Sequence, residues 1–189
     1  MQKMALGVAL VLGMLGAEAV RAQGMSVKSS ELSDGSTIQE EQVTNVYWTG
    51  CKGGNISPSR SWSGAPSNTK SFAITVYDPD EPSGSGFWHW VVFNIPPETT
   101  SIPKNAGNVK AKLMPKGAIQ SRTDFSTDGY NGPCPAQGDK PHHYIFTVYA
   151  VDENKLQLAK DDKVSAAVVG AELHVHANAK ASLTATYGR

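Results

Sequence analysis

Residues 71–77 read Ser-Phe-Ala-Ile-Thr-Val-Tyr, and this short apolar stretch decides the fold class of the chain. Two further stretches, residues 88–95 and 144–151, have the same character. All three are rich in β-branched and aromatic residues, are bounded by Pro and Gly, and are too short for typical helices, so they predict strands. Their apolar side chains occupy consecutive positions, which indicates strands with both faces covered. We therefore expect three central strands of a sheet.

Weaker patterns on either side of these stretches indicate a mainly β fold. We expect a strand near residues 42–47 and an alternating last strand at residues 182–187. Residues 96–143 contain no long periodic run, and a connection of that length inside a compact domain is usually functional. Near the C-terminus, Asp161 or Asp162 can cap a helix. Its apolar residues recur at spacings of four, three and four: Val164, Val168, Ala171 and Val175. The pattern predicts a β-sandwich with a helix near its C-terminus.

The N-terminal segment has the layout of a cleavable secretory signal. Lys3 precedes an apolar stretch at residues 4–17, which leads into small residues up to Ala22. Cleavage after Ala22 and cleavage after Ala19 both fit this pattern. The apolar stretch is shorter than the roughly 20 residues that span a bilayer, so we expect no transmembrane segment. We expect a signal peptide at residues 1–22, a single domain at residues 23–189, and a periplasmic or secreted protein.

The charge of the chain excludes one class of partner. Seventeen basic and 17 acidic side chains give no net charge at pH 7. A neutral chain without a dense Lys or Arg cluster offers no electrostatic footprint for nucleic acid, so we expect no nucleic-acid partner. Four lysines gather within residues 104–116, but Pro and Gly interrupt that segment, which is typical of a solvated loop. The oligomeric state stays open, with a homodimer among the alternatives.

Polar side chains collect where the predicted strands begin or end. Asp78 and Asp80 follow the first strand in the segment Asp-Pro-Asp-Glu-Pro, and His89 lies in Trp-His-Trp at the start of the second. Two segments precede the third strand: Gly-Tyr-Asn-Gly-Pro-Cys-Pro at residues 129–135 and Pro-His-His-Tyr at residues 141–144. Carboxylates two residues apart share one side if a strand continues through them, whereas Asp-Pro-Asp is equally typical of a turn. From the residues alone, both interpretations stand.

These segments, in this order, resemble the phosphatidylethanolamine-binding protein family, which includes the Raf kinase inhibitor proteins. The resemblance extends from about residue 33 to the C-terminus. It also includes Asn-Ile-Ser-Pro at residues 55–58, Trp-Ser-Gly-Ala-Pro at 62–66 and the final Thr-Tyr-Gly-Arg. Together with the signal, the sequence is similar to the exported bacterial branch of the family. The resemblance implies a Greek-key arrangement of two antiparallel sheets with peripheral helices.

The resemblance also implies a small ligand cavity. The candidate ligand-binding residues come from the polar segments: Asp78, Asp80, His89, Tyr130, Gly132, Pro133, His142 and Tyr144. Family membership would imply binding of phospholipid head groups or of other phosphorylated and anionic ligands. Some members inhibit kinases or serine proteases, which suggests a protein partner. A kinase target conflicts with export from the bacterial cytoplasm, so that partner stays unidentified.

The chemistry of these side chains suits an anion. His89 and His142 can donate hydrogen bonds, Tyr144 offers a hydroxyl, and the loop at residues 129–135 can present backbone N–H groups. Asp78 would repel a phosphate, so we expect it to hold an imidazole, with His89 as the donor, and to keep that donor charged. The sequence therefore predicts a phosphoryl or carboxylate head group as the ligand, and no cofactor.

Three other histidines need a separate interpretation. His143 would face the opposite side of its strand from His142, so we expect it at the surface. His174 and His176 form a possible metal pair, but a two-residue spacing on a helix separates them by about 200°. They would share a face only on a strand, so the metal interpretation requires the predicted helix to be wrong.

Enzymatic alternatives have less support in the sequence. A serine hydrolase would need a Gly-x-Ser-x-Gly turn, which the chain lacks. Cys134 is a candidate nucleophile beside His142. The principal alternative is a hydrolase that uses Asp78, Asp80 and His89, with or without a metal, although their spacing matches no strong metal signature. We therefore expect a binding protein and not an enzyme.

The two cysteines, Cys51 and Cys134, both lie in loops rich in Gly and Pro. Export would place the chain in an oxidising compartment. We therefore predict a disulfide between them. It would tie the loop after the predicted strand near residues 42–47 to the loop beside the cavity.

Overall fold

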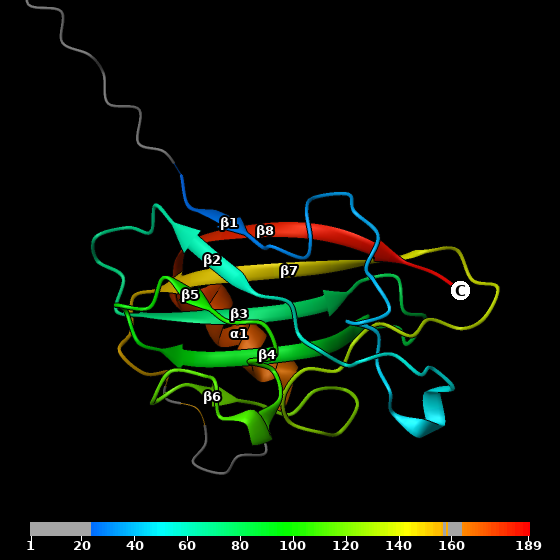
Figure 1. The fold of residues 1–189 in the computed structure, drawn as a ribbon. Helices are drawn as coiled ribbons and strands as arrows, with labels where there is room; N and C mark the ends of the chain where they lie inside the picture. The colour runs from blue at the N-terminus through cyan, green and yellow to red at the C-terminus, as the bar shows by residue number, and fades with distance from the viewer. Residues whose placement is uncertain (1–23, 157, 159–163) are drawn as a thin grey trace, which may run out of the picture.

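The computed structural model describes residues 24–156, 158 and 164–189 (Figure 1). The expected signal peptide and the expected helix cap at Asp161 or Asp162 lie outside the described residues. Within the described part there are eight strands, one α-helix and two 3₁₀ helices. Their bounds are β1 (Ser26–Lys28), η1 (Tyr47–Thr49), β2 (Arg60–Ser63), β3 (Ser71–Asp78), β4 (Phe87–Ile95), β5 (Ser101–Ile102), η2 (Val109–Ala111), β6 (Ile119–Gln120), β7 (His142–Val151), α1 (Ala166–His176) and β8 (Ala177–Tyr187).

The strands form two antiparallel sheets. The small sheet has the order β1-β2-β5, and the large sheet has the order β6-β4-β3-β7-β8. The three stretches predicted as central strands are β3, β4 and β7, and they occupy the middle of the large sheet. The expectation of a mainly β fold with two antiparallel sheets and a helix near the C-terminus is confirmed.

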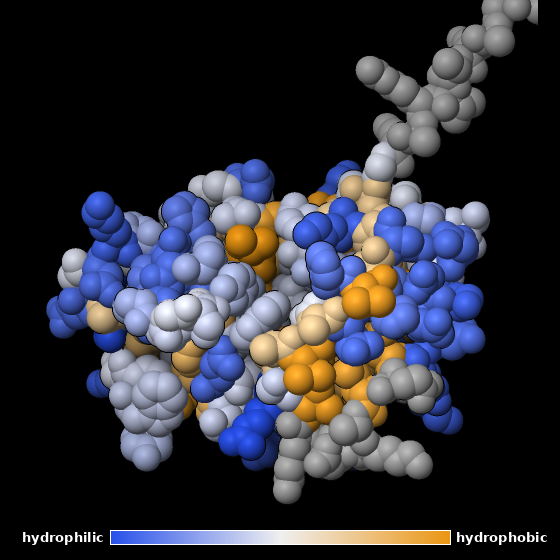
Figure 2. All heavy atoms as spheres, turned by 180° about the vertical axis from the view of Figure 1, so that it is seen from behind, coloured by the Kyte–Doolittle hydropathy of each residue, from blue (hydrophilic) through white to orange (hydrophobic). Residues whose placement is uncertain are grey.

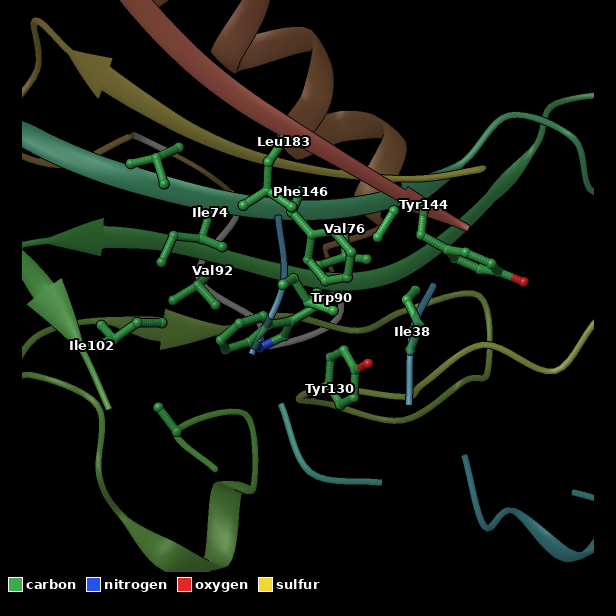
Figure 3. Close-up of a cluster of buried hydrophobic side chains, with 14 of the residues drawn as sticks. Ile38, Ile74, Val76, Trp90, Val92, Ile102, Tyr130, Tyr144, Phe146 and Leu183 are labelled. Atoms are coloured by element: carbon green, nitrogen blue, oxygen red, sulfur yellow. The ribbon is translucent and has the colours of Figure 1, made fainter. Parts of the chain in front are cut away.

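The large sheet has a hydrophobic core on each face, which explains its continuous apolar runs. Toward the small sheet, Ile74 and Val76 of β3 pack with Trp90 of β4 and Ile102 of β5 (Figure 3). Toward α1, the side chains that alternate with these form a second core: Ala73, Val91, Phe93, Val151, Leu156, Val164, Ala166, Val169 and Leu173. Tyr144 lies at the edge of the first core, with its hydroxyl directed away from the other labelled side chains (Figure 3).

The expected strand near residues 42–47 is wrong. The N–H groups of Gln42 and Val43 donate to the carbonyls of Gln39 and Glu40, which forms local turns in place of a strand ladder. Val43 is buried, so its apolar character reflects packing of a turn against the core.

The helix is confirmed, but two of the apolar residues from which it was predicted face solvent. Val168 and Val175 are 48% and 71% exposed, whereas Val169 and Leu173 are buried against the sheet. The helix begins after Ser165, whose hydroxyl accepts a hydrogen bond from the N–H of Val168. Because α1 is apolar on two sides, periodicity could not identify the packed side. Figure 2, seen from behind, shows apolar side chains on the face that carries α1.

None of the helices in the described ranges has the length and apolar character needed to cross a bilayer.

The last strand is longer than expected, because β8 begins at Ala177, directly after the helix.

Candidate functional site

A cavity of about 320 Å³ lies where β3 ends, β4 begins and β7 starts. Its aromatic wall comes from four side chains: Trp48, Phe87, Phe125 and Tyr144. Its ionisable side chains are Asp78, Glu81, His89 and Arg189, and the lining is completed by Thr49, Cys134 and Ala136. The cavity therefore joins three of the predicted site residues, Asp78, His89 and Tyr144, to others that the sequence analysis did not single out.

Asp78 is a buried carboxylate whose oxygen atoms are already engaged. Its Oδ1 accepts hydrogen bonds from the backbone N–H groups of Asp80 (2.8 Å) and Glu81 (3.1 Å). Its Oδ2 accepts one from Nδ1 of His142 (2.8 Å), which is also buried. Three donors therefore compensate this charge before any ligand binds. The arrangement also joins the turn after β3 to the first residue of β7.

His89 reaches the cavity because β4 contains a bulge. Val76 pairs with Trp90, but the next residue of β3, Tyr77, pairs with Trp88, so His89 is an extra residue in the ladder. A bulge of this kind changes the side to which a side chain points. The His89 ring consequently lies 5.1 Å from the ring of Tyr144.

The buried imidazole of His89 is neutral in its resting state. Burial lowers the pKa of His89, and the Asn131 carbonyl and the Asp78 charge oppose this only in part. Nδ1 of His89 lies 2.8 Å from the Asn131 carbonyl oxygen. Since a carbonyl oxygen only accepts, the proton is on Nδ1. The expectation that Asp78 holds His89 is wrong: Asp78 holds His142, because β7 lies beside β3 and the bulge directs His89 to Asn131.

Tyr144 and Glu81 are two oxygen groups of the cavity wall whose pKa values are raised. Burial, then the charge of Asp78 and a hydrogen bond to that carboxylate, raise the pKa of Tyr144, so its hydroxyl keeps its proton and directs it to Asp78. Burial, followed by the charge of Asp78, also raises the pKa of Glu81. Both effects reduce the negative charge that a ligand meets in the cavity.

Arg189 supplies a positive charge at the cavity wall. Its Nε donates to the Pro135 carbonyl (2.7 Å) and its Nη2 donates to the Thr49 carbonyl (3.2 Å). The predicted disulfide between Cys51 and Cys134 is present and joins the same two loops. Among the described residues, no Asp or Glu side chain lies within ion-pair distance of Arg189. Arg189 is part of the final motif Thr-Tyr-Gly-Arg, which supported the family resemblance, but the sequence analysis assigned this arginine no role.

Asp80 does not share the side of Asp78. Its carboxylate Oδ2 accepts hydrogen bonds from the backbone N–H and Nδ1 of His143, both 2.7 Å long, on the exposed side of β7. Burial raises the pKa of Asp80, but these hydrogen bonds from His143 lower it overall. The strand ends at Asp78 and the chain turns at Pro79, so the turn interpretation holds. The surface position expected for His143 is confirmed, since His142 and Tyr144 are buried while His143 is exposed.

The loop at residues 129–135 supports the cavity from behind. The N–H of Tyr130 donates to the Gly107 carbonyl, and the N–H of Gly132 donates to Oδ1 of Asn55. These two groups are therefore not the free anion donors that the sequence suggested. A Cβ at Gly132 would overlap the carbonyl of Gln42, so this close approach of backbones requires glycine. Pro133 accepts a hydrogen bond from the N–H of Thr44, and neither Tyr130, Gly132 nor Pro133 lines the cavity.

The residues of the hydrolase alternative do not assemble. Asp80 is directed to His143, away from Asp78 and His89, and Cys134 is in a disulfide. One atom each of Asp78, Glu81 and His142 lie within 4.8 Å of one another, as metal ligands would. A cation there would displace the hydrogen bond between Asp78 and His142, so this set fits a metal poorly.

Comparison with known proteins shows the class to which this fold and cavity belong. The family model described as phosphatidylethanolamine-binding protein matches residues 28–188. The chain is therefore a member of the phosphatidylethanolamine-binding protein (PEBP) family.

Particular relatives agree with this assignment. The chain is 46% identical to the UPF0098 protein YbcL of Escherichia coli over 167 residues, which cover 88% of this chain and 89% of YbcL. It is 44% identical to the UPF0098 protein YbhB of the same organism, over 86% of this chain and 99% of YbhB. The crystal structure of E. coli YbcL, described as a new member of the mammalian PEBP family, superposes with a TM-score of 0.84 and 45% identity. It covers 88% of this chain and 99% of that one.

Proposed function

We propose that this protein captures a small ligand with a phosphoryl or carboxylate head group in the cavity beside Asp78. The observation that carries the proposal is the Arg189 guanidinium, which lies in the cavity wall without a carboxylate partner in the described part of the chain. A guanidinium is well suited to phosphate and carboxylate groups. The hydroxyl of Tyr144, which is hydrogen-bonded to Asp78, lies in the same wall and can turn its proton to a ligand that competes with that carboxylate.

The acidic residues of the cavity are compatible with an anion. Asp78 is compensated by His142 and two backbone N–H groups, so it serves to fix the wall. The raised pKa of Glu81 means that this carboxylate takes up a proton more readily than an ordinary glutamate when an anion approaches. Neutral His89 can accept a hydrogen bond from a protonated phosphoryl oxygen, or take up a proton when an anion arrives. Ligand cavities usually measure about 300–1,000 Å³, so this one suits a head group and not a whole lipid.

The proposal also includes the location and the partner protein that the sequence led us to expect. The protein acts outside the cytoplasm after removal of its signal peptide, and it modulates a partner protein in response to the bound ligand. This role needs no catalysis. Support comes from membership of a family named for ligand binding and from the signal-like N-terminal sequence.

Calorimetric titration with phosphoethanolamine and with inorganic phosphate tests the binding proposal. Arg189→Gln should weaken binding of both probes by about tenfold or more, since it removes the charged donor. His89→Ala should also weaken binding strongly. Arg122→Gln and His143→Ala change exposed side chains outside the cavity and serve as matched controls. Equal losses in cavity and control variants would refute the assignment of the site.

An assay of phosphoester, peptide and ester hydrolysis separates binding from catalysis. We expect no turnover, with or without added divalent metal. Hydrolysis that is lost in folded His89→Ala would instead support an enzyme.

A further inference from the structure

A second group of ionisable side chains lies at the opposite end of the large sheet. Asp152 and Glu153 follow the last residue of β7, and His176 is the last residue of α1. One potential ligand atom from each of the three lies within 4.8 Å of the others. β7 separates this group from His142 by ten residues, or roughly 30 Å (Figure 1). The group is therefore independent of the cavity.

One oxygen of this group accepts no hydrogen bond within the part of the chain that the structure describes. Oδ1 of Asp152 is shielded from solvent and accepts no hydrogen bond from the described residues. The nearest imidazole atom, Nδ1 of His176, lies 3.4 Å away, beyond the usual length of a charged hydrogen bond. Two ligands of a tetrahedral zinc ion, with bonds of about 2.0–2.1 Å, are roughly 3.3 Å apart. The spacing of these two atoms therefore matches a shared metal ion.

The backbone around the group is held by three elements. The N–H of Asp152 donates to the carbonyl of His176 (3.0 Å), which joins the end of β7 to the end of α1. The hydroxyl of Ser71, the first residue of β3, donates to the carbonyl of Glu153 (2.7 Å). Val151 pairs with Ala177 across an irregularity in the β7–β8 ladder. Ligand atoms on such a frame lose little freedom when they bind an ion.

The electrostatics favour a cation at this position. Asp152 and Glu153 both contribute carboxylates, and Oε2 of Glu172 lies 3.7 Å from the other ring nitrogen of His176. The partial negative charge at the C-terminus of α1 acts in the same direction. About half of the Asp152 side chain is exposed (45%), so an ion can enter from solvent.

We propose that Asp152, Glu153 and His176 bind a divalent transition-metal ion of the zinc type. One imidazole with carboxylates suits zinc and its neighbours, whereas magnesium and calcium prefer oxygen ligands alone. The carboxylate of Glu172, 3.7 Å from the other ring nitrogen of His176, adds negative charge beside the site. The bound ion joins the end of α1 to the end of the sheet. His174 takes no part, because it points to a different side of the helix.

The test uses the purified chain after treatment with a chelator. Zinc is added in competition with a chromophoric chelator, and cobalt is added with its visible spectrum as the readout. We expect one strong site per chain, with about tenfold or greater loss of affinity in His176→Ala and in Asp152→Asn. His174→Ala, on the same helix, should bind as the unaltered chain does. Magnesium should not compete.

Three outcomes would overturn the proposal: no zinc binding, binding unchanged in His176→Ala, or equal loss in His174→Ala. Loss in His142→Ala with retention in His176→Ala would also overturn it, because it would place the ion beside Asp78. Circular dichroism of each variant confirms that the fold is kept. Phosphoethanolamine titration of His176→Ala, Asp152→Asn and His174→Ala is expected to be unchanged, so failure of this proposal is separable from failure of the ligand proposal.

Discussion

The two ends of the large sheet each place an aspartate directly beside a histidine, but they leave those pairs in different states. At the cavity end, Asp78 is buried, and its two oxygens accept three hydrogen bonds, one of them from His142. At the helix end, Asp152 is partly exposed, and its Oδ1 accepts none from the described residues. The aspartate at the cavity end therefore has hydrogen bonds to both oxygens, whereas the aspartate at the helix end has one oxygen without a hydrogen bond from the described residues.

The difference shows how a carboxylate's surroundings determine its use. A carboxylate whose two oxygens already accept hydrogen bonds holds neighbouring groups in place and leaves binding to other side chains, here Arg189 and His89. A carboxylate with a free oxygen in a fixed frame is itself a ligand. We therefore expect substitutions at Asp78 to affect stability first, and substitutions at Asp152 to affect ion binding first.

Removal of the disulfide should have the largest effect on the free energy of unfolding, because only the cavity end of the sheet has a covalent cross-link. Cys51 and Cys134 are 83 residues apart in sequence. The chain-entropy description assigns a closed loop of this length about 4 kcal/mol of stability. We expect Cys51→Ala combined with Cys134→Ala to lower the free energy of unfolding by about that amount in urea titrations.

Reduction of the unaltered chain is the control, since it should produce a similar loss without a sequence change. Free-thiol titration of the denatured, unreduced protein should find no thiol. Two free thiols would show that the disulfide is absent. A change in the free energy of unfolding below about 1 kcal/mol would show that it contributes little to stability.

Substitution of the two aspartates should give the next largest effect on the free energy of unfolding. Asp78→Asn removes a buried charge that compensates His142 and two backbone N–H groups, so it should cost about 3 kcal/mol of unfolding free energy. Asp152→Asn, in chelator-treated protein, should change the unfolding free energy by less than about 1 kcal/mol, because the replaced Oδ1 accepts nothing from the described residues. Equal losses in the two variants would remove the distinction between a complete and an incomplete site.

A pH titration of stability gives the smallest effect. Because burial lowers the pKa of His89, the unfolded chain takes up a proton near pH 6.5 that the native chain does not. Stability linked to His89 is therefore present above pH 6.5 and is lost as the pH falls toward the folded pKa. Stability should fall between pH 7 and pH 5, and the part of this fall that is linked to His89 should be absent in His89→Gln.

His143→Gln is the matched control for this titration, because His143 is exposed and pairs only with exposed Asp80. Its stability profile should fall with pH as that of the unaltered chain does. A His89→Gln profile that falls equally steeply would mean that the imidazole is not held neutral.

The sheet could be predicted from sequence because its evidence is local. Residues 71–77, 88–95 and 144–151 are apolar at consecutive positions, and only a strand buried on both faces explains such runs of this length. The helix could also be predicted, because its apolar spacing is local. Val168 and Val169 belong to two different apolar stripes, and only packing against the sheet determines which stripe is buried. A buried turn such as that at Val43 has no periodic signal at all.

The cavity was harder to predict because its contacts come from distant segments. Asp78 and His142 are 64 residues apart, and the bulge that directs His89 into the cavity depends on the pairing of two strands. Asp78, His89 and Tyr144 were placed there by resemblance to a family. Arg189 and Trp48 were missed although both follow the ends of predicted strands, because nothing in their local sequence indicates that they face the cavity. Local sequence shows where polar groups collect, but not which of them face each other.

The most direct measurement of the central claim is an NMR titration of the histidine ring signals with phosphoethanolamine. The chain has five histidines, two of which flank the cavity and three of which lie elsewhere. If an anion enters beside Arg189, the His89 ring signals should shift strongly and saturate, and those of His143 and His174 should remain in place. Saturable shifts of His143 or His174 equal to those of His89, or no shift of His89 at saturating ligand, would contradict the account.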